Sequence, residues 1–315
     1  MSAPGMSGPD MTGPGASGPD MSGPDGTSGP DMGRRGGTIA GTGTDVEGIS
    51  ANGYPIYRVD TSRFPPPRQT RHEFLSGLHR VLRPRTYLEI GVAEGFGLEL
   101  SACTTIGVDP EPRLSRTLPA AFELVRETSD EFFARDDPLR AFAGIPPDLV
   151  FIDGMHLAEF ALRDLIGVER VSGPGTVVVF DDVLPRRDEE ADRDRASEYW
   201  TGDVFKLVGL LRRRRPDLAC ALVNTDPTGT LVVVGLNPAS TTLTDAYDEL
   251  VADIVTPDPQ QVPHELIART HAVDALDALW WDGWRRLVQA RGSAEPSMPR
   301  ETVELFRQRF SAAAT

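Results

Sequence analysis

The apolar positions divide the chain into a periodic part and an N-terminal part without periodicity. From Tyr54 onward, short apolar runs of strand length alternate with segments whose apolar residues recur every three or four positions. The strand-like runs are 86–91, 104–109, 122–125, 148–153, 176–181, 219–223 and 230–236. This alternation predicts a seven-stranded, largely parallel sheet with helices on both faces, the doubly wound, Rossmann-like α/β class.

Helical spacing is clearest in two of the intervening segments. Residues 71–82 place Phe74 and Leu78 on one face and end before a proline, so they predict a helix. A second helix is expected over about 203–215. Its last turn carries Arg212–Arg215, where basic side chains offset the negative end of the helix dipole, and we prefer that role to nucleic-acid contact.

The two ends of the chain differ from this central part. After 230–236, which is joined to 219–223 by a hairpin-like Asn-Thr-Asp-Pro-Thr-Gly, residues 239–315 predict a helical C-terminal extension. Its tryptophans 280, 281 and 284 have helical spacing, so we expect them to pack or to join two copies of the chain in a homo-oligomer.

The N-terminal segment 1–50 has a composition of its own. It holds 14 Gly and 6 Pro and repeats Ser-Gly-Pro-Asp at 7–10, 17–20, 22–25 and 28–31. Such a segment cannot bury enough apolar surface to offset the entropy of ordering it. We therefore predict a disordered tail over 1–50.

Charge and cysteine content exclude several classes of protein. The 32 basic and 47 acidic residues give a net charge of -15, which argues against binding a phosphate backbone. Two cysteines cannot build a disulfide framework, and no apolar run reaches the roughly 18 residues that cross a bilayer. We expect a cytoplasmic protein that binds neither nucleic acid nor membrane.

A glycine-rich loop follows the first predicted strand of the sheet. That strand carries Glu89 near its end, and Gly91, Gly95 and Gly97 follow with the spacing Gly-x-x-x-Gly-x-Gly. This spacing differs from the pyrophosphate fingerprint Gly-x-Gly-x-x-Gly. Twenty residues after Glu89 the next strand ends at Asp109, whose carboxylate can accept hydrogen bonds from both hydroxyls of a ribose.

Acidic residues end two further strands that are expected to be neighbours. The run 148–153 ends at Asp153, and the run 176–181 ends at Asp181 and Asp182. Ligands bind at the carboxyl ends of strands in open α/β sheets, and three carboxylates meeting there would repel one another without a cation. Oxygen ligands suit a hard ion, so these residues predict a Mg²⁺ site.

These features, over about 70–236, resemble the class I methyltransferases that use S-adenosylmethionine. The resemblance implies a methyltransferase domain over 51–238. It also implies contacts to the methionine, ribose and adenine parts of the cofactor from Glu89, Gly91, Gly95, Gly97, Asp109 and Ser129. For Ser129 the alternative is a helix N-cap before Asp130-Glu131.

Within that class, the acidic cluster is similar to that of metal-dependent O-methyltransferases, and most similar to the macrocin and mycinamicin sugar O-methyltransferases. In that type a His three residues after the first metal ligand is the general base, which His156 would be here. Met155 stands where many relatives carry an acid. The alternative for His156 is a structural position at the start of the helix that follows.

The resemblance implies methyl transfer to a hydroxyl of a sugar or natural-product scaffold. The alternatives are a non-catalytic interaction subunit with this fold and a metal-independent N- or C-methyltransferase. Tyr199 and Trp200 are candidate walls of an acceptor pocket, and Lys206 is a candidate contact for an anionic group. We expect Asp203 to cap the helix that begins at about Val204.

Overall fold

The computed structural model describes residues 45–311 except 117, 119–120 and 296. The tail predicted over 1–50 therefore lies mostly outside the described residues. For its last residues the prediction is wrong, because β1 (Val46–Ile49) pairs in antiparallel fashion with β2 (Pro55–Tyr57). The glycine- and proline-rich composition ends just before β1, and a valine and an isoleucine then favour a strand.

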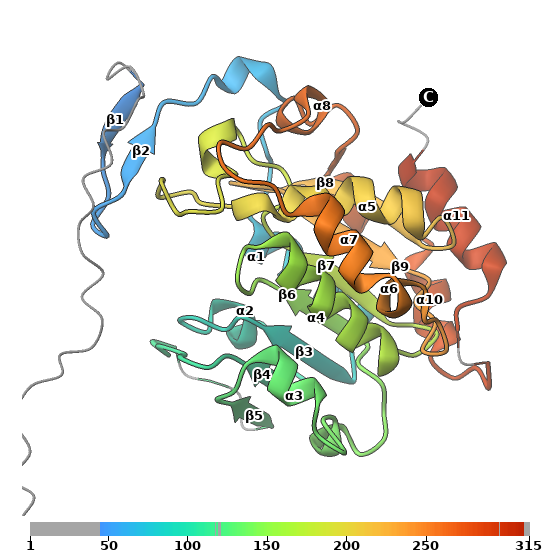
Figure 1. Cartoon of the computed structure of the whole chain (residues 1–315). Helices are drawn as coiled ribbons and strands as arrows, with labels where there is room; N and C mark the ends of the chain where they lie inside the picture. Colours follow the sequence, from blue (N-terminus) through green and yellow to red (C-terminus); the bar gives the residue numbers. More distant parts are fainter. Residues whose placement is uncertain (1–44, 117, 119–120, 296, 312–315) are drawn as a thin grey trace, which may run out of the picture. The chain divides into compact units, whose positions relative to one another are not determined.

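An eight-stranded sheet forms the centre of the fold (Figure 1). Its order is β10-β8-β9-β7-β6-β3-β4-β5, and only β9 runs antiparallel to its neighbours. The strands are β3 (Thr86–Ile90), β4 (Thr104–Val108), β5 (Phe122–Val125), β6 (Leu149–Ile152), β7 (Val177–Phe180), β8 (Ala219–Asn224), β9 (Thr230–Val234) and β10 (Val273–Asp274). All seven predicted strands are confirmed, as is the doubly wound class with a final hairpin.

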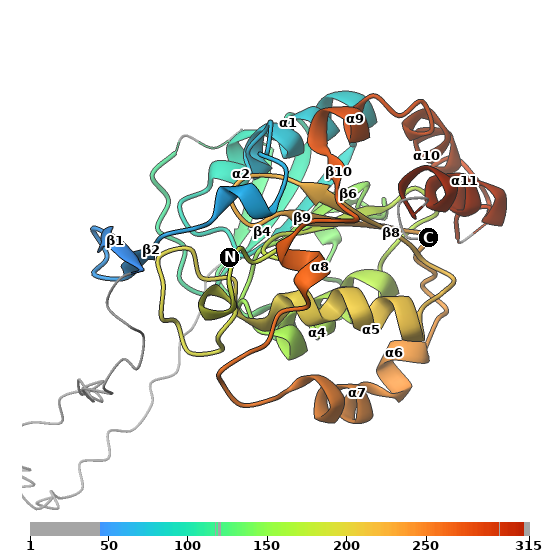
Figure 2. The same ribbon diagram turned by 90° about the horizontal axis from the view of Figure 1, so that it is seen from above.

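Helices cover both faces of this sheet, as Figure 2 shows from above. On one face lie α4 (Ala158–Arg170), α5 (Lys206–Arg214) and α7 (Tyr247–Ile254), which bury leucines such as Leu165 and Leu210. On the other face lie α1 (Arg71–Leu82), α9 (Ala275–Leu279), α10 (Trp284–Ala290) and α11 (Arg300–Ser311). The shorter helical elements are η1 (Thr61–Arg63), α2 (Phe96–Glu99), α3 (Ser129–Phe133), η2 (Arg140–Phe142), η3 (Asp188–Glu190), η4 (Gly202–Phe205), α6 (Thr242–Asp245) and α8 (His264–Ile267).

The predicted helix 71–82 is confirmed residue by residue as α1. Thr70 caps its N-terminus: the Thr70 hydroxyl accepts from the Glu73 amide, and the Glu73 carboxylate accepts from the Thr70 amide at 2.8 Å. This reciprocal capping fixes the first turn of α1. The first turn carries Arg71 and His72 toward the carboxyl edge of the sheet, where β3, β6 and β7 end.

The region 239–315 is mostly helical, as predicted, but it is built into the sheet rather than appended to it. β10 pairs with β8, α9 and α10 pack on α1, and α11 packs on β8. Trp281 and Trp284 pack with Phe306 and Phe310 of α11, which confirms a packing role for them, whereas Trp280 is 83% exposed. None of the helices in the described part of the chain is long and apolar enough to cross a membrane.

The arginine run near residue 212 has two environments. Arg212–Arg214 occupy the last turn of α5, as the dipole argument predicts. Arg215 follows at the C-cap and is buried, and its guanidinium lies 2.6 Å from Glu169 and 2.8 Å from Asp217. Arg215 thus stands at the end of the helix, as predicted, and its charge is also paired with two carboxylates.

Candidate active site

The glycine-rich loop follows β3 and presses against the end of β6. Gly91 has a φ of +83°, and a Cβ on it would lie 1.9 Å from the Asp153 carbonyl oxygen. Gly97 faces inward, and a Cβ there would lie 2.5 Å from Oε2 of Glu89. Gly95 also has a positive φ, of +87°. Because glycine has no side chain, the loop can pack directly against Glu89 and against the backbone of Asp153. The structure thus brings the loop, Glu89 and Asp153 together.

Glu89 is buried beneath this loop, and among the described residues its carboxyl group has one hydrogen-bond partner. The Tyr87 hydroxyl donates to Oε2 of Glu89 at 2.6 Å. Burial raises the pKa of Glu89 to about 8, although the Tyr87 hydrogen bond acts in the opposite direction. A cationic ligand group beside Glu89 would favour its ionised form, so this carboxyl is suited to an ammonium group.

Asp109 lies at the end of β4, as predicted, and it fastens the glycine-rich loop. Its Oδ2 accepts hydrogen bonds from the amides of Val92 and Ala93 at 2.9 and 2.8 Å, and its Oδ1 accepts from the Glu111 amide at 2.8 Å. A carboxylate has about four acceptor positions, so three are used. In this conformation Asp109 can accept one further hydrogen bond, which fits one ribose hydroxyl rather than two.

Ser129 is the first residue of α3 and does not cap it. Thr128 is the cap: its hydroxyl accepts from the Glu131 amide, and the Glu131 carboxylate accepts from the Thr128 amide. The N-cap alternative is therefore wrong by one residue. The Ser129 side chain instead hydrogen-bonds the buried carboxyl of Asp164, whose pKa burial raises to about 7. The contact of Ser129 to the cofactor adenine stays a prediction.

A group of three side chains forms at the carboxyl ends of β6 and β7. Asp153, His156 and Asp182 each offer a ligand atom, and these atoms lie within 4.8 Å of one another. His156 lies between the carboxylates, with Nε2 3.3 Å from Asp153 and Nδ1 2.9 Å from Asp182. Two carboxylates and an imidazole form a donor set that divalent cations accept.

Asp181 lies outside this group, in contrast to its predicted role as a metal ligand. Its Oδ2 lies 2.9 Å from Nε of Arg71, and its side chain is buried on the α1 face of the sheet. Both residues follow β7, which ends at Phe180, and Asp182 has a φ of 62°, in the left-handed region. This backbone conformation accompanies the divergence of Asp182 from Asp181, and Asp182 accepts a hydrogen bond from the Thr228 hydroxyl at 2.6 Å. The group thus replaces one predicted oxygen ligand with a nitrogen.

The charge on His156 is set by the two carboxylates. Burial alone would lower the pKa of His156, but Asp182 and Asp153 raise it well above its ordinary value. Burial would likewise raise the pKa of Asp153, and the hydrogen bond with His156 together with the charge of Arg71 lowers it. The two carboxylates thus favour the protonated imidazole. A cation bound to the same carboxylates would compete with that proton.

Trp200 supports the imidazole from the loop after β7. Its ring stacks on His156, with centroids 5.0 Å apart and planes 5° from parallel, and its carbonyl oxygen lies 3.0 Å from His156 Nδ1. A Cβ on Gly202 would lie 1.7 Å from the His156 carbonyl oxygen, so this loop packs tightly against the group. Trp200, a candidate acceptor wall in the sequence, is thus also a neighbour of the predicted base.

Two predictions about the same loop are wrong. Asp203 does cap a helix, but the helix is α4: its Oδ1 accepts from the Ala158 amide at 2.8 Å. Lys206 is held inside the protein, where Nζ donates to Asp203, the Ile254 carbonyl and Thr256. Lys206 is therefore not available for an anionic acceptor.

Sequence reasoning missed Arg71, His72 and Thr228. Arg71 and His72 open α1. Burial and the charge of Arg71 lower the pKa of His72, and the charge of Asp153 only partly opposes them. If the sequence analysis had placed the start of helix 71–82 beside the ends of the central strands, it could have identified Arg71 and His72 as candidate site residues. No signal in the sequence points to Thr228.

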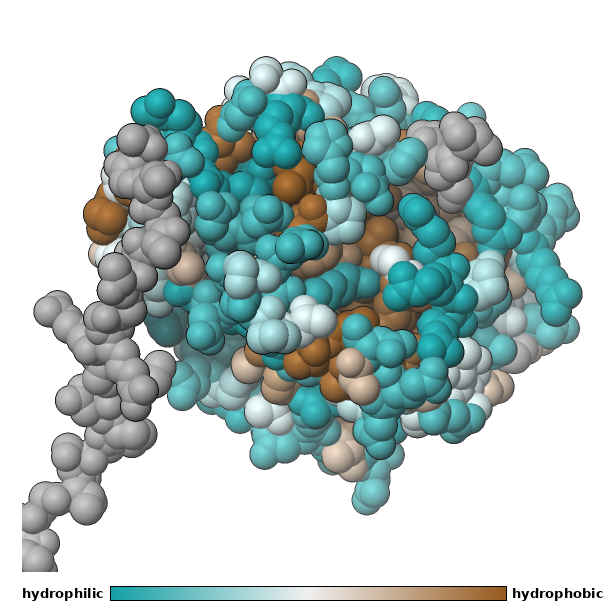
Figure 3. Space-filling view, turned by 45° about the horizontal axis from the view of Figure 1, so that its top comes forward, coloured by the Kyte–Doolittle hydropathy of each residue, from teal (hydrophilic) through white to brown (hydrophobic). Residues whose placement is uncertain are grey.

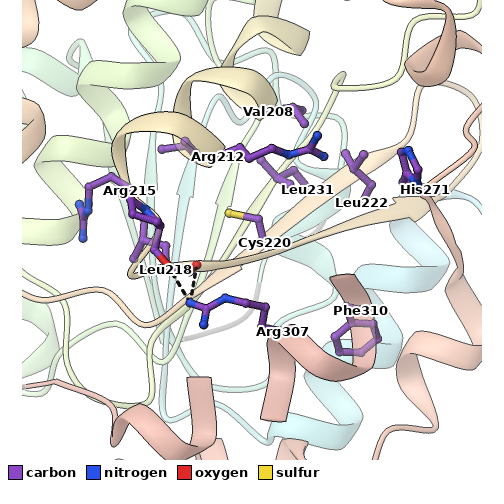
Figure 4. Close-up of a pocket in the computed structure, with 12 residues that line it drawn as sticks. Val208, Arg212, Arg215, Leu218, Cys220, Leu222, Leu231, His271, Arg307 and Phe310 are labelled. Carbon is purple, nitrogen blue, oxygen red and sulfur yellow. Dashed lines mark hydrogen bonds between the residues drawn. The ribbon is translucent and has the colours of Figure 1, made fainter. Parts of the chain in front are cut away.

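A separate cavity of about 430 Å³ lies beyond β8, between α5 and α11 (Figure 4). Cys220 lines it, and burial raises the pKa of this thiol to about 12, which keeps it protonated and unreactive. Arg307, on the opposite wall, donates to the carbonyls of Pro216 and Leu218. No residue of the Asp153 group lines this cavity, so the candidate active site remains at the carboxyl edge.

Comparison with known proteins identifies the domain. Residues 88–183 match the model of a family described as a methyltransferase domain. No curated protein matches the chain.

Among solved structures, the chain is similar at 20% identity and a TM-score of 0.41 to cofactor-bound Rv0187 from MTB, covering 55% of this chain and 84% of that one. It is also similar, with 20% identity and a TM-score of 0.40, to the O-methyltransferase TomG from Streptomyces achromogenes; the match covers 52% of this chain and 78% of that one. For an O-methyltransferase from Bacillus cereus the identity is 16% and the TM-score 0.39, and the match covers 55% of this chain and 84% of that one. At these scores the similarities decide nothing by themselves.

The family match and the strand order point to one class of enzyme. The matched segment runs from β3 past the end of β7, and it contains the glycine-rich loop, Asp109 and the group at Asp153. The antiparallel β9 lies between β7 and β8 and forms the hairpin predicted from the sequence. This part of the chain therefore matches a methyltransferase domain.

Proposed function

We propose that the protein transfers a methyl group from S-adenosylmethionine to a hydroxyl oxygen of a small molecule, such as a sugar or a natural-product scaffold. The observation that carries the proposal is the contact between the glycine-rich loop and the Asp153 group. Gly91 packs on the Asp153 backbone so closely that no side chain fits between them. A hydroxyl bound at the group would therefore lie beside the cofactor loop, and this proximity would supply much of the acceleration.

In this proposal Asp153 and Asp182 would hold a divalent cation that competes with the proton on His156. His156, freed of that proton and not itself a ligand, would then be the base that accepts the proton of the acceptor hydroxyl. A bound cation lowers the pKa of a hydroxyl that it coordinates. Thr228 orients Asp182 through its hydrogen bond, and Trp200 orients the imidazole through stacking. The two oxygen ligands suit Mg²⁺ or Mn²⁺.

Glu89 and Asp109 are proposed to hold the cofactor from either side of the glycine-rich loop. Glu89 is placed to pair with the ammonium group of the methionine part, and Asp109 to accept from one ribose hydroxyl. Both residues contact the same loop. Asp109 accepts hydrogen bonds from the amides of Val92 and Ala93, and Glu89 lies against Gly97.

Calorimetry with S-adenosylmethionine tests the first step. The unaltered protein should bind the cofactor, and Asp109→Ala should weaken binding more than tenfold, or about 1.4 kcal/mol. Glu111→Ala is the matched control, because its backbone amide, and not its side chain, contacts Asp109. Mass spectrometry of the product from a panel of alcohols and phenols should then show a methyl ether. Absence of cofactor binding by the unaltered protein would refute the proposal.

A further inference from the structure

Arg269, which follows α8, is a buried cation that forms no ion pair with the carboxylates of the described residues. Charged side chains mostly lie at the surface, which is largely hydrophilic in Figure 3, whereas only 2% of Arg269 is exposed. Burial and the charge of Arg186 lower the pKa of Arg269 to about 10. The charges of Asp226 and Glu190 oppose this shift only in part. Burying a guanidinium without an ion pair costs free energy, so the contacts of this side chain need an explanation.

The guanidinium of Arg269 holds two segments of the chain together. Its Nη1 and Nη2 donate to three acceptors at the end of β8 and in the loop to β9, which are the side chain of Asn224, the carbonyl of Thr225 at 3.2 Å and the carbonyl of Pro227. Nη2 also donates to the carbonyl of Leu184, two residues after Asp182, at 3.5 Å. Arg269 thus joins the β8–β9 loop to the segment that follows β7.

The same two segments meet at the candidate active site. The Thr228 hydroxyl donates to Oδ1 of Asp182 at 2.6 Å, and the Thr228 carbonyl accepts from the Leu184 amide at 2.7 Å. A Cβ on Gly229 would lie 2.4 Å from Cδ1 of Leu184, so the segments pack without space between them. Arg269 therefore fixes the backbone next to Thr228 and, through Thr228, the carboxylate of Asp182.

The β8–β9 loop also contacts the start of α1. The Asp226 amide donates to the Gln69 carbonyl at 2.9 Å, and the Asp226 carbonyl accepts from the Arg71 amide at 3.1 Å. The Arg71 side chain pairs with Asp181. One loop thus contacts the partners of both acidic residues that follow β7, and Arg269 holds the carbonyls on either side of Asp226.

We propose that Arg269 is a positioning residue for the candidate active site. It holds the β8–β9 loop in the place from which Thr228 directs the Asp182 carboxylate at His156. A guanidinium suits this role, because its planar fork donates to several carbonyls at once and an ammonium group lacks that geometry. The importance of this positioning for methyl transfer rests on the proposed function. Arg269 lies outside the matched segment 88–183, so the C-terminal part of the chain contributes to the site.

NMR of the full chain with isotope-labelled histidine tests this inference. The imidazole of His156 reports on Asp182, because Nδ1 lies 2.9 Å from that carboxylate. Its signal is assigned by its loss in His156→Gln and is followed at one pH without added metal or cofactor. We expect Arg269→Met and Thr228→Val each to shift the Nδ1 signal of His156 by more than its linewidth. The double variant should show no further shift, because Arg269 acts through Thr228.

Two further variants separate positioning from a general loss of stability. Arg269→Lys keeps the charge with a smaller change in volume, and it should give a smaller shift in the same direction. Arg215→Met is the matched control, because Arg215 is equally buried, lines the separate cavity beyond β8 and pairs with Glu169 and Asp217. It should leave the His156 signal in place. An unchanged signal in both Arg269 variants, an equal shift in Arg215→Met, or additive shifts in the double variant would overturn the inference.

Binding of Mn²⁺ gives a second readout on the same variants. Arg269→Met should weaken Mn²⁺ binding about tenfold, because Asp182 loses its orientation. The dissociation constant of S-adenosylmethionine should stay the same, since Arg269 does not contact the glycine-rich loop. Mn²⁺ binding by Arg269→Met equal to that of the unaltered protein would overturn the positioning role and leave the proposed function intact.

Failure of the proposed function would give a different result. The His156 signal would then shift as predicted in the Arg269 and Thr228 variants. The unaltered protein, however, would bind no S-adenosylmethionine or would form no methyl ether.

Discussion

Gly97→Ala should disrupt the cofactor site through a single steric contact. The added methyl group would lie 2.5 Å from Oε2 and 2.8 Å from Cδ of Glu89, well inside normal contact distances. Glu89 is buried and its one hydrogen bond, from Tyr87, has a length of 2.6 Å. The carboxyl group cannot move away without losing this bond or displacing its neighbours.

The expected magnitude follows from these contacts. Overpacking of a filled interior costs about 1–3 kcal/mol, and a buried polar group that loses its partner costs about 1–3 kcal/mol. We therefore expect Gly97→Ala to lower the free energy of unfolding by about 2–6 kcal/mol. It should also weaken S-adenosylmethionine binding by more than about tenfold, because Glu89 is displaced from the cofactor loop.

Chemical denaturation and calorimetry on matched variants check this reasoning. Gly209→Ala, within α5, is the control: its new methyl group would meet only the flexible end of Arg213, at 3.1 Å. It should stabilise the protein by about 0.5–1 kcal/mol through helix propensity and leave cofactor binding unchanged.

The double variant Glu89→Ala with Gly97→Ala should recover stability without recovering cofactor affinity, because the steric overlap is gone but the carboxyl group is absent. Gly97→Ala with the affinity and stability of the unaltered protein would refute the steric argument.

The sequence predicted the sheet well because each central strand is an apolar run between turn residues. β10 escaped prediction because two residues, Val273 and Asp274, make no recognisable pattern, and they pair with β8 only through the tertiary fold. β1 escaped because its four residues follow a long glycine-rich segment that dominates the local composition.

The candidate site was predicted in part for an equally physical reason. Asp153 and Asp182 follow strands that become neighbours, so the strand order alone brings them together. Which of Asp181 and Asp182 would face His156 depends on the backbone after β7, where Asp182 adopts a left-handed conformation. The partner of Asp181, Arg71, comes from a helix far away in the sequence, and only the three-dimensional structure shows the pair.

Three further predictions follow from the buried charges and the stacked rings. Arg71→Met should lower the free energy of unfolding at pH 7 by about 3–5 kcal/mol, because Asp181 would be left buried without its cation. In urea unfolding, the double variant with Asp181→Asn should regain most of this stability. An Arg71→Met variant as stable as the unaltered protein would contradict a stabilising ion pair between Arg71 and Asp181. Asp164→Asn should stabilise the protein at pH 8 by up to about 4 kcal/mol. The reason is that burial raises the pKa of Asp164 from 3.8 to about 7, so folding favours its proton and stability falls as pH rises from about 4 to 7; the gain should shrink at pH 5.5, and a gain independent of pH would contradict this. Trp200→Ala should slow methyl transfer about tenfold or more while the dissociation constant of S-adenosylmethionine stays the same, because the indole contacts His156 and not the glycine-rich loop; an unchanged rate would contradict its positioning role.

The most direct test of the proposed chemistry is the dependence of methyl transfer on a divalent cation. The enzyme is stripped with a chelator, and the initial rate of S-adenosylhomocysteine formation from a neutral hydroxyl acceptor is followed while Mg²⁺ or Mn²⁺ is added. We predict that chelation lowers the rate at least about a hundredfold, since Lewis-acid activation contributes several kcal/mol, and that a saturating concentration of the cation restores the rate. Asp182→Asn should abolish the return, and Asp130→Asn, at an exposed position on α3, should preserve it. A rate that chelation leaves unchanged would contradict the cation site at Asp153 and Asp182.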